Sequence, residues 1–188
     1  MRYNILISGP PASGKSTLVR EIIKDRNAGG ILTPEIRKDG ERFGFKVIDI
    51  KTNREAVFAS IEMKPRIVSR YGLDIQAFEK IAIPAIQNAI EKSDFVCIDE
   101  IGAMEIHSPA FRQLVEQALD AKKVIATISF KSKNTFIEKV KERKDVKMHY
   151  LTRVNRERIL KEVIIESIKD KTHLQPIFKQ VFDEVYDP

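Results

Sequence analysis

A glycine-rich segment near the N-terminus carries the residue types that bind polyphosphate. It fits the pattern G-x-x-x-x-G-K-[ST] and consists of Gly9, Pro10, Pro11, Ala12, Ser13, Gly14, Lys15 and Ser16, followed by Thr17. In this pattern backbone N–H groups surround the phosphates, the lysine reaches the β- and γ-phosphates, and the hydroxyl holds Mg²⁺. We therefore expect residues 9–17 to bind a nucleotide, with Lys15 acting in catalysis and Ser16 as a metal ligand.

Two adjacent acidic residues supply the carboxylates that such a loop requires. Residues 95–98 form a short apolar run typical of a buried strand, and Asp99 and Glu100 follow directly. A carboxylate that ends a strand beside a phosphate loop holds Mg²⁺ through its water shell, and a neighbouring glutamate can polarise the attacking water. We predict a metal role for Asp99 and a catalytic role for Glu100. The alternative is that both only solvate a strand end.

The surrounding pattern predicts the elements that position these residues. Short apolar runs alternate with amphipathic segments along the chain, which is typical of a mostly parallel sheet with helices on both faces. The expected fold class is therefore a three-layer α/β fold that also contains an antiparallel hairpin. The expected strands are 3–8, 56–60, 95–98, 124–128 and 146–151, and the expected helices are 17–24, 75–92, 109–121, 135–144 and 156–169.

The antiparallel hairpin is predicted from an Asp-Gly turn signal between two strand-like segments. Its arms are 31–37 and 42–50, and Pro34 restricts the first arm to an edge or a bulge. Residues 63–72 are basic and are expected to be irregular. Asp74 then has the position and side chain of a helix N-cap.

Length and composition restrict the class of protein. A chain of 188 residues suits one domain, which we place at 1–170, with an amphipathic extension at 171–188 that packs on the same domain. One cysteine excludes an internal disulfide framework and a cysteine-based zinc site. No apolar run is long enough to span a membrane, and the early first strand leaves no room for a signal peptide, so we expect a cytoplasmic protein.

Several short motifs follow one another along the chain. They are G-x-P-x-x-G-K-S-T at 9–17, T-x-E-I-R at 33–37, R-x-G-F at 42–45, Y-G-x-D at 71–74 with Phe78 and Pro84, D-E-I-G-x-M-E at 99–105, and Asn155-Arg156. Together they resemble the motifs of the THEP1-type nucleoside triphosphatases, which have a three-layer P-loop NTPase fold. The resemblance extends in order over residues 1–168, and the run at 99–105 is highly characteristic of the family.

The resemblance implies Mg²⁺-dependent hydrolysis of nucleoside 5′-triphosphates, such as ATP and GTP, to the diphosphate and phosphate. It places Lys15 and Ser16 on the phosphates and metal, Asp99 on the water shell of the metal, and Glu100 on the attacking water. The expected partners are nucleoside triphosphates with broad base specificity, and no membrane.

The resemblance also implies roles for residues outside the phosphate loop. Glu35 and Arg37 lie on the hairpin arm that would face the γ-phosphate, where Arg37 or Arg42 would neutralise transition-state charge. For Arg42 an exposed position on the hairpin is the favoured alternative. Asn155 and Arg156 follow the strand at 146–151 and would lie near the base, although Asn155 also suits a helix N-cap.

Glu105 belongs to the matching run at 99–105, and it either orients the site or is a surface charge. The chain departs from the family pattern in three ways. Ala12 stands where the family has glycine, which stiffens the phosphate loop, and Ala103 stands where the family has lysine, which removes a positive charge. The segment 173–188 continues past the usual end of the family. We expect a monomer, with this segment as the contact through which a dimer would form.

Two other functions fit parts of the same pattern. A nucleotide or nucleoside kinase uses the same phosphate loop but needs an acceptor pocket and an arginine-bearing lid, and no lid insertion is evident. A nucleotide-dependent nucleic-acid-binding module would use the basic segment 131–147, although a solvated helix face is favoured there. The net charge of +6 is compatible with binding either a nucleic acid or a polyphosphate substrate.

Overall fold

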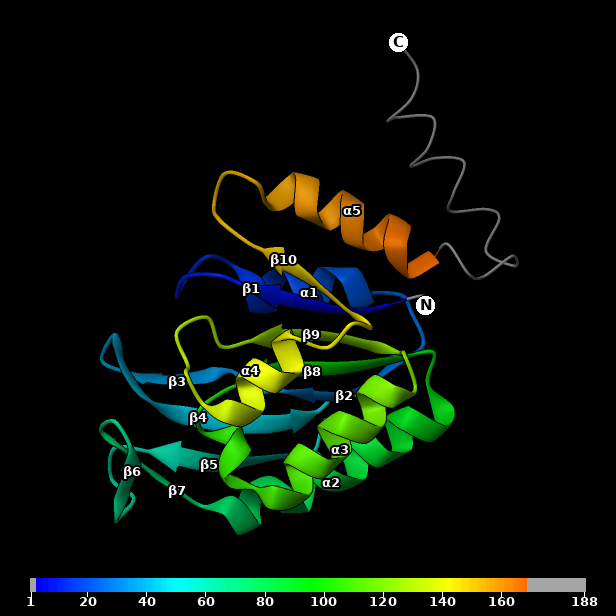
Figure 1. The fold of residues 1–188 in the computed structure, drawn as a ribbon. Helices are drawn as coiled ribbons and strands as arrows, with labels where there is room; N and C mark the ends of the chain where they lie inside the picture. Colours follow the sequence, from blue (N-terminus) through cyan, green and yellow to red (C-terminus); the bar gives the residue numbers. More distant parts are fainter. Residues whose placement is uncertain (1–2, 169–188) are drawn as a thin grey trace.

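The protein folds around one large sheet. The computed structural model describes residues 3–168 and orders the strands β10-β1-β9-β8-β2-β4-β5-β7-β6, with β3 paired to β4 beside this path (Figure 1). The predicted extension at 171–188 lies outside the described residues. No helix in the described part of the chain is both long enough and apolar enough to cross a membrane.

The parallel half of the sheet contains four of the strands predicted from apolar runs, and also β2, which was predicted only in part, as the start of the hairpin arm 31–37. Their side chains are almost entirely buried except in β10, which lies at the edge of the sheet. β8 is longer than the predicted 95–98, because it continues through Asp99 and Glu100. The five strands are β1 (Asn4–Ser8), β2 (Ala28–Leu32), β8 (Phe95–Ile101), β9 (Val124–Ile128) and β10 (Val146–Tyr150).

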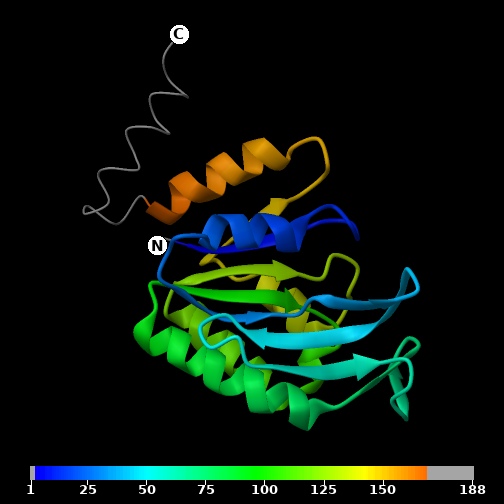
Figure 2. The same ribbon diagram turned by 180° about the vertical axis from the view of Figure 1, so that it is seen from behind.

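Helices cover both faces of the parallel strands, which confirms the predicted three layers (Figures 1 and 2). One face packs against two helices through a core that includes Leu18 and Val163, and the other packs against three helices through a larger core centred on Phe58, Phe78 and Phe111. The first face carries α1 (Lys15–Ile23) and α5 (Arg156–Ile168), and the second carries α2 (Ile75–Lys92), α3 (Pro109–Asp120) and α4 (Thr135–Lys141).

Local capping signals explain where the helices begin. The predicted cap of α2 is confirmed, because Asp74 Oδ1 accepts a hydrogen bond from Ala77 N at 2.9 Å. Ser108 caps α3 in the same way, with Phe111 N 2.9 Å from its Oγ. α4 ends at Lys141 rather than at the predicted residue 144, because the chain turns there into β10.

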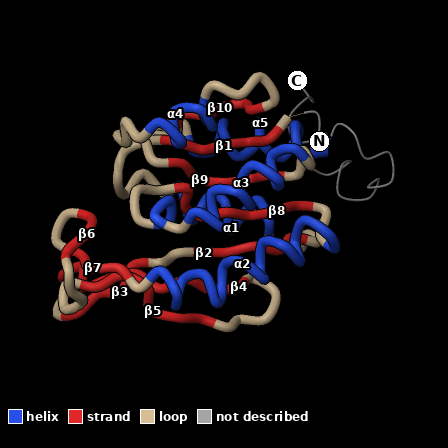
Figure 3. The backbone as a smooth tube through the Cα atoms, turned by 60° about the horizontal axis from the view of Figure 1, so that its bottom comes forward, coloured by secondary structure: helices blue, strands red, loops and turns tan. Residues whose placement is uncertain are grey.

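The antiparallel half of the sheet forms a wing beyond β2. Thr33 and Pro34 divide the predicted arm 31–37 between β2 and β3, because proline has no N–H to continue the ladder. The prediction that 63–72 is irregular was wrong, because this segment contains β6 and most of β7. Figure 3 shows β3, β6 and β7 together at one end of the wing. The wing consists of β3 (Glu35–Lys38), β4 (Glu41–Asp49), β5 (Glu55–Ser60), β6 (Arg66–Val68) and β7 (Tyr71–Leu73).

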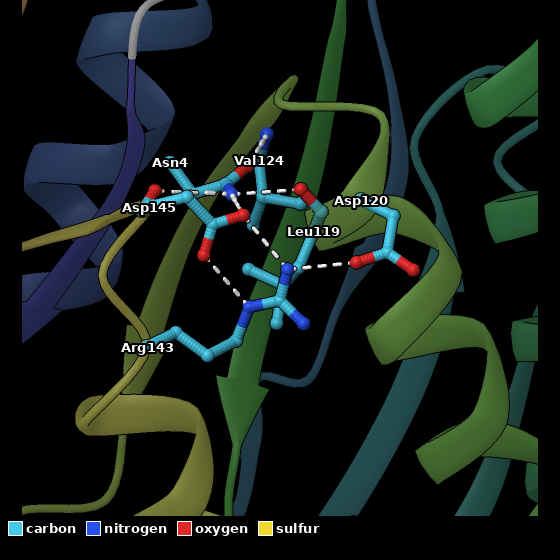
Figure 4. A network of polar contacts seen from close by, with 6 residues as sticks. All are labelled: Asn4, Leu119, Asp120, Val124, Arg143 and Asp145. Carbon is cyan, nitrogen blue, oxygen red and sulfur yellow. Dashed lines mark hydrogen bonds and ion pairs between the residues drawn. The ribbon is translucent and has the colours of Figure 1, made fainter.

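A buried polar network fixes the amino end of β1 (Figure 4). Asn4 is fully buried, and its Nδ2 donates to Leu119 O at 2.8 Å while its Oδ1 accepts from Val124 N at 3.1 Å. Arg143 binds Asp145 and extends the network toward the end of α3. One side chain therefore connects β1 with the end of α3 and the start of β9.

Candidate active site

The phosphate loop connects the carboxyl end of β1 to the first residue of α1. Gly9 has φ of 153°, and a Cβ atom there would lie 2.3 Å from Leu151 O, so only glycine permits this approach to the end of β10. Lys15 Nζ donates to Gly9 O at 3.1 Å and to Pro10 O at 3.0 Å. The N-terminus of α1 and the Lys15 ammonium group thus lie together at the loop, which is the arrangement that anion binding requires.

Ser13 is the unusual polar residue of this loop. Its side chain is only 7% exposed, and its Oγ is the one buried side-chain nitrogen or oxygen in residues 3–168 that has no hydrogen-bond partner. Buried hydroxyl groups are normally paired, because an unpaired one loses its hydration without compensation. The unpaired hydroxyl therefore marks a place where the loop can offer one more donor to an anion.

Asp99 connects the phosphate loop to the neighbouring strands. Its Oδ1 accepts from Ser16 Oγ at 3.0 Å and from Thr127 Oγ1 at 2.6 Å, and the carboxylate is almost fully buried. Its backbone carbonyl accepts from Thr33 Oγ1 at 2.7 Å. Sequence reasoning paired Ser16 with Asp99, quoted Thr33 in a family motif without giving it a role, and missed Thr127. The available signal was a hydroxyl residue in the otherwise apolar run 124–128.

The oxygen atoms at this point fit a magnesium ion. Mg²⁺ prefers hard oxygen ligands and is usually held by one or two protein groups together with phosphates and water. Ser16 Oγ and the Asp99 carboxylate provide such a pair. No cluster of three or more His, Cys, Asp or Glu side chains suited to a metal was found within residues 3–168, so the described chain does not offer a rival all-protein metal cage.

Two carboxyl groups flank Gly102, one from Glu100 within β8 and one from Glu105 beyond the end of β8. A Cβ atom at Gly102 would lie 2.7 Å from Glu105 Oε2 and 3.4 Å from Glu100 Cγ, so the missing side chain makes room for both glutamates. Burial raises the pKa of Glu100, the Lys15 charge opposes this rise, and the Asp99 charge adds to it. Burial and the Glu100 charge raise the pKa of Glu105 to about 8. Glu105 is therefore a buried part of the site and not a surface charge.

The raised pKa of Glu105 predicts a specific dependence of stability on pH. The folded-state pKa of about 8 lies above the ordinary value of 4.5, so the folded state binds this proton more tightly. The corresponding stability is fully present below about pH 4.5 and is lost as the pH rises through about 8. Glu105→Gln removes the titration, so its stability relative to wild type should rise from pH 5 to pH 9, by up to ~4 kcal/mol.

Urea unfolding at several pH values, in buffer that contains a chelator, measures this difference. Glu116→Gln, on the exposed side of α3, is the matched control and should follow the wild-type pH profile. Parallel pH profiles for Glu105→Gln and wild type would show that Glu105 does not titrate in this range.

Ala12 occupies a backbone conformation that favours glycine. Its φ is 58°, in the left-handed region where a Cβ atom is strained. Ala12→Gly should therefore stabilise the protein by about 0.5–1 kcal/mol, measured by thermal or urea unfolding. Ala103→Gly is the control and should destabilise the protein, because Ala103 is also exposed but has no positive φ. If Ala12→Gly destabilises the protein as Ala103→Gly should, the strain at Ala12 is not significant.

The hairpin residues predicted for catalysis contact one another. Glu35 Oε1 lies 2.6 Å from Arg37 Nε, and Glu35 Oε2 lies 2.5 Å from Arg42 Nε. Partial burial acts to raise the pKa of Glu35, but the hydrogen bonds from the two arginines hold it below the ordinary value. Arg37 also donates to Gly40 O at 2.8 Å. The structure thus brings Glu35 and Arg37 together with Arg42 on an exposed hairpin, and not against Lys15 or Glu100.

Asn155 and Arg156 hold the loop that follows β10. Asn155 Oδ1 accepts from Thr152 N at 2.8 Å, and its Nδ2 donates to Tyr150 O at 2.9 Å. The Asn155 side chain therefore fixes this loop, and only its backbone carbonyl accepts a bond from the first turn of α5. Arg156 forms an ion pair with Glu21 on α1.

Part of the basic segment 131–147 is neutralised within the fold. Arg143 binds Asp120 and Asp145, and Lys147 binds Glu166. These ion pairs reduce the free positive charge that a nucleic acid would meet on this segment.

The arrangement defines the class of protein. A helix N-terminus and a lysine at the end of β1, beside a hydroxyl bonded to a carboxylate of β8, match what binding of a magnesium-complexed polyphosphate requires. β9 lies between β1 and β8 and contributes Thr127 to the same carboxylate. The chain is a P-loop NTPase by fold and by site.

Comparison with known proteins identifies the family. A family model described as NTPase matches residues 4–164. Nucleoside-triphosphatase THEP1 of Thermotoga sp. strain RQ2 is 39% identical over 163 residues, which cover 85% of this chain and 92% of the relative. The corresponding protein of Methanothermobacter thermautotrophicus is 36% identical over 166 residues, covering 85% and 93%.

A solved structure agrees with this assignment. The crystal structure of THEP1 from Aquifex aeolicus superimposes with a TM-score of 0.79 at 31% identity, and it covers 87% of this chain and 98% of the other. The chain therefore belongs to the THEP1 family of nucleoside triphosphatases, and the resemblance inferred from the motifs is confirmed.

Proposed function

We propose that this protein hydrolyses nucleoside 5′-triphosphates to the diphosphate and phosphate, that it needs Mg²⁺, and that it accepts several bases. The observation that carries this proposal is the 3.0 Å hydrogen bond between Ser16 Oγ and Asp99 Oδ1, with Glu100 as the next residue of β8. This bond joins the phosphate loop to the strand end that carries the carboxylates. Ser16 and Asp99 would hold Mg²⁺, which when bound neutralises negative charge on the phosphates.

The proposed reaction is an in-line displacement at the γ-phosphorus. The oxygen of a water molecule forms a bond to the γ-phosphorus, the bond to the β–γ bridging oxygen breaks, and the diphosphate leaves. Glu100 accepts the proton of the attacking water, and its raised pKa makes it a stronger base than an exposed glutamate. Lys15 and the loop N–H groups bind the phosphates, and the unpaired Ser13 hydroxyl adds a donor.

Other residues position the catalytic and metal-binding side chains or border the proposed nucleotide site. Thr127 and Thr33 hold Asp99 in place through its carboxylate and its carbonyl. The hairpin begins immediately after Thr33, so we propose that Arg37 reaches the γ-phosphate, with Glu35 orienting it. We further propose that the loop held by Asn155, together with Arg156, borders the nucleotide.

A phosphate-release screen tests the proposal. Several nucleoside triphosphates and diphosphates are incubated with Mg²⁺ or with a chelator, each with and without added nucleosides or nucleoside monophosphates. We expect phosphate release from triphosphates with Mg²⁺ alone and with no acceptor. Transfer to an added acceptor without phosphate release would identify a kinase instead. Turnover that requires RNA or DNA, with a steep dependence on salt, would identify a nucleic-acid-dependent module.

A further inference from the structure

Two aromatic side chains at the carboxyl edge of the sheet are exposed and touch each other. Phe130, in the loop after β9, is 44% exposed, and Tyr150, the last residue of β10, is 46% exposed. Their ring centroids are 5.2 Å apart and the ring planes are inclined by 58°. Large exposed apolar side chains that cluster at one place commonly mark a binding surface.

The register of the sheet places this pair level with the end of β1, from which the phosphate loop continues. Tyr150 is the register partner of Ser8, the last residue of β1, and Leu151 N donates to Ser8 O at 2.7 Å. β1 lies between β9 and β10, so the ends of the two strands that carry or precede these rings flank the end of β1. Side chains alternate along β10: His149 faces α5, so Tyr150 lies on the opposite face, which it shares with Val146 and α4. The pair therefore lies at the carboxyl end of β1, on the face of the sheet opposite α1.

A third apolar side chain belongs to the same edge. Val154 is 96% exposed in the loop between β10 and α5. Asn155 fixes this loop by its bonds to Thr152 N and Tyr150 O, so the exposure of Val154 is set by an ordered loop. The same asparagine thus links the Val154 loop to the backbone of Tyr150.

We infer that Phe130 and Tyr150 form the binding platform for the nucleobase of a nucleotide whose phosphates lie in the loop at 9–14. This inference rests on the proposed function, because it assigns the base of the same substrate. Stacking on an aromatic ring accepts every base, since each base has a π-face, and it favours the larger purines. Among Phe130, Tyr150 and Val154, only Tyr150 has a polar side-chain group, its hydroxyl, that could read the edge of a base. The platform therefore predicts broad base acceptance with a purine preference.

Equilibrium binding with and without a base tests the platform. The probes are ADP, CDP and inorganic pyrophosphate, titrated by calorimetry against wild type, Phe130→Ala and Tyr150→Ala. Each variant should lose about 5- to 30-fold in ADP affinity, with a smaller loss for CDP, while pyrophosphate affinity stays within about 2-fold. Tyr150→Phe should retain most of the ADP affinity. Ile67→Ala, which removes an apolar side chain of equal exposure on β6, should bind all probes like wild type.

The outcomes separate the platform from the proposed function. Unchanged ADP affinity in both alanine variants overturns the platform, and so does an equal loss for ADP and pyrophosphate, because the rings would then act on the loop and not on the base. Wild-type protein that binds ADP with the expected pattern but releases no phosphate from any triphosphate would overturn hydrolysis and leave the platform supported.

Discussion

Replacing Glu100 by glutamine is expected to slow triphosphate hydrolysis by roughly 10²- to 10⁴-fold while the affinity for the triphosphate is retained. Glutamine keeps the size of the side chain beside Asp99 but cannot accept the proton of the attacking water. The phosphate loop is unchanged, so binding should remain. Steady-state phosphate release measures kcat, and titration with a non-hydrolysable triphosphate measures binding.

The control for this prediction is Glu116→Gln, an equivalent change on the exposed side of α3, which should leave kcat unchanged. A variant at Glu100 with near-normal turnover would mean that another group accepts the proton. Glu105 is then the next candidate, because it flanks Gly102 together with Glu100, and Glu35 follows.

Asn4→Leu is expected to lower the free energy of unfolding by about 2–4 kcal/mol. The change leaves Leu119 O and Val124 N without their side-chain partner in a fully buried position, and each unpaired group costs about 1–3 kcal/mol. The apolar leucine side chain offsets part of this loss. Urea unfolding followed by circular dichroism measures the difference.

Asn88→Leu provides the comparison for this stability effect. Asn88 is an exposed asparagine of α2, so its replacement should change the free energy of unfolding by no more than about 0.5 kcal/mol. If Asn4→Leu had an equally small effect, the network of Figure 4 would not hold the amino end of β1 in place.

Much of the parallel half of the fold was predictable, because its signals are local. The apolar run before Gly9 and the amphipathic run after it specify β1 and α1, and Asp74 marks the first turn of α2. The wing was less predictable. β6 and β7 contain no turn signal of the Asn-Gly or Gly-Gly type, and their pairing depends on β5, so no local pattern indicates it.

The residues of the candidate site likewise include some that sequence patterns predict and some that only the fold brings together. Lys15, Ser16, Asp99 and Glu100 belong to sequence patterns with a known chemical purpose. The contact of Thr127 with Asp99 depends on the strand order β1-β9-β8, which no run of residues specifies. The burial of Glu105 depends likewise on how the chain folds after β8. Residues that act through another residue are therefore the ones that sequence reasoning missed.

The two hydrogen bonds of Lys15 to the loop carbonyls have a consequence for affinity. A lysine side chain has up to about 2 kcal/mol of rotamer entropy, and a flexible lysine loses it when it binds a ligand. Here Gly9 O and Pro10 O already hold the ammonium group, and an ammonium group has three N–H donors. One donor is left to meet a phosphate oxygen. The loop thus presents a preorganised cation, so little of the binding free energy is lost in ordering the lysine.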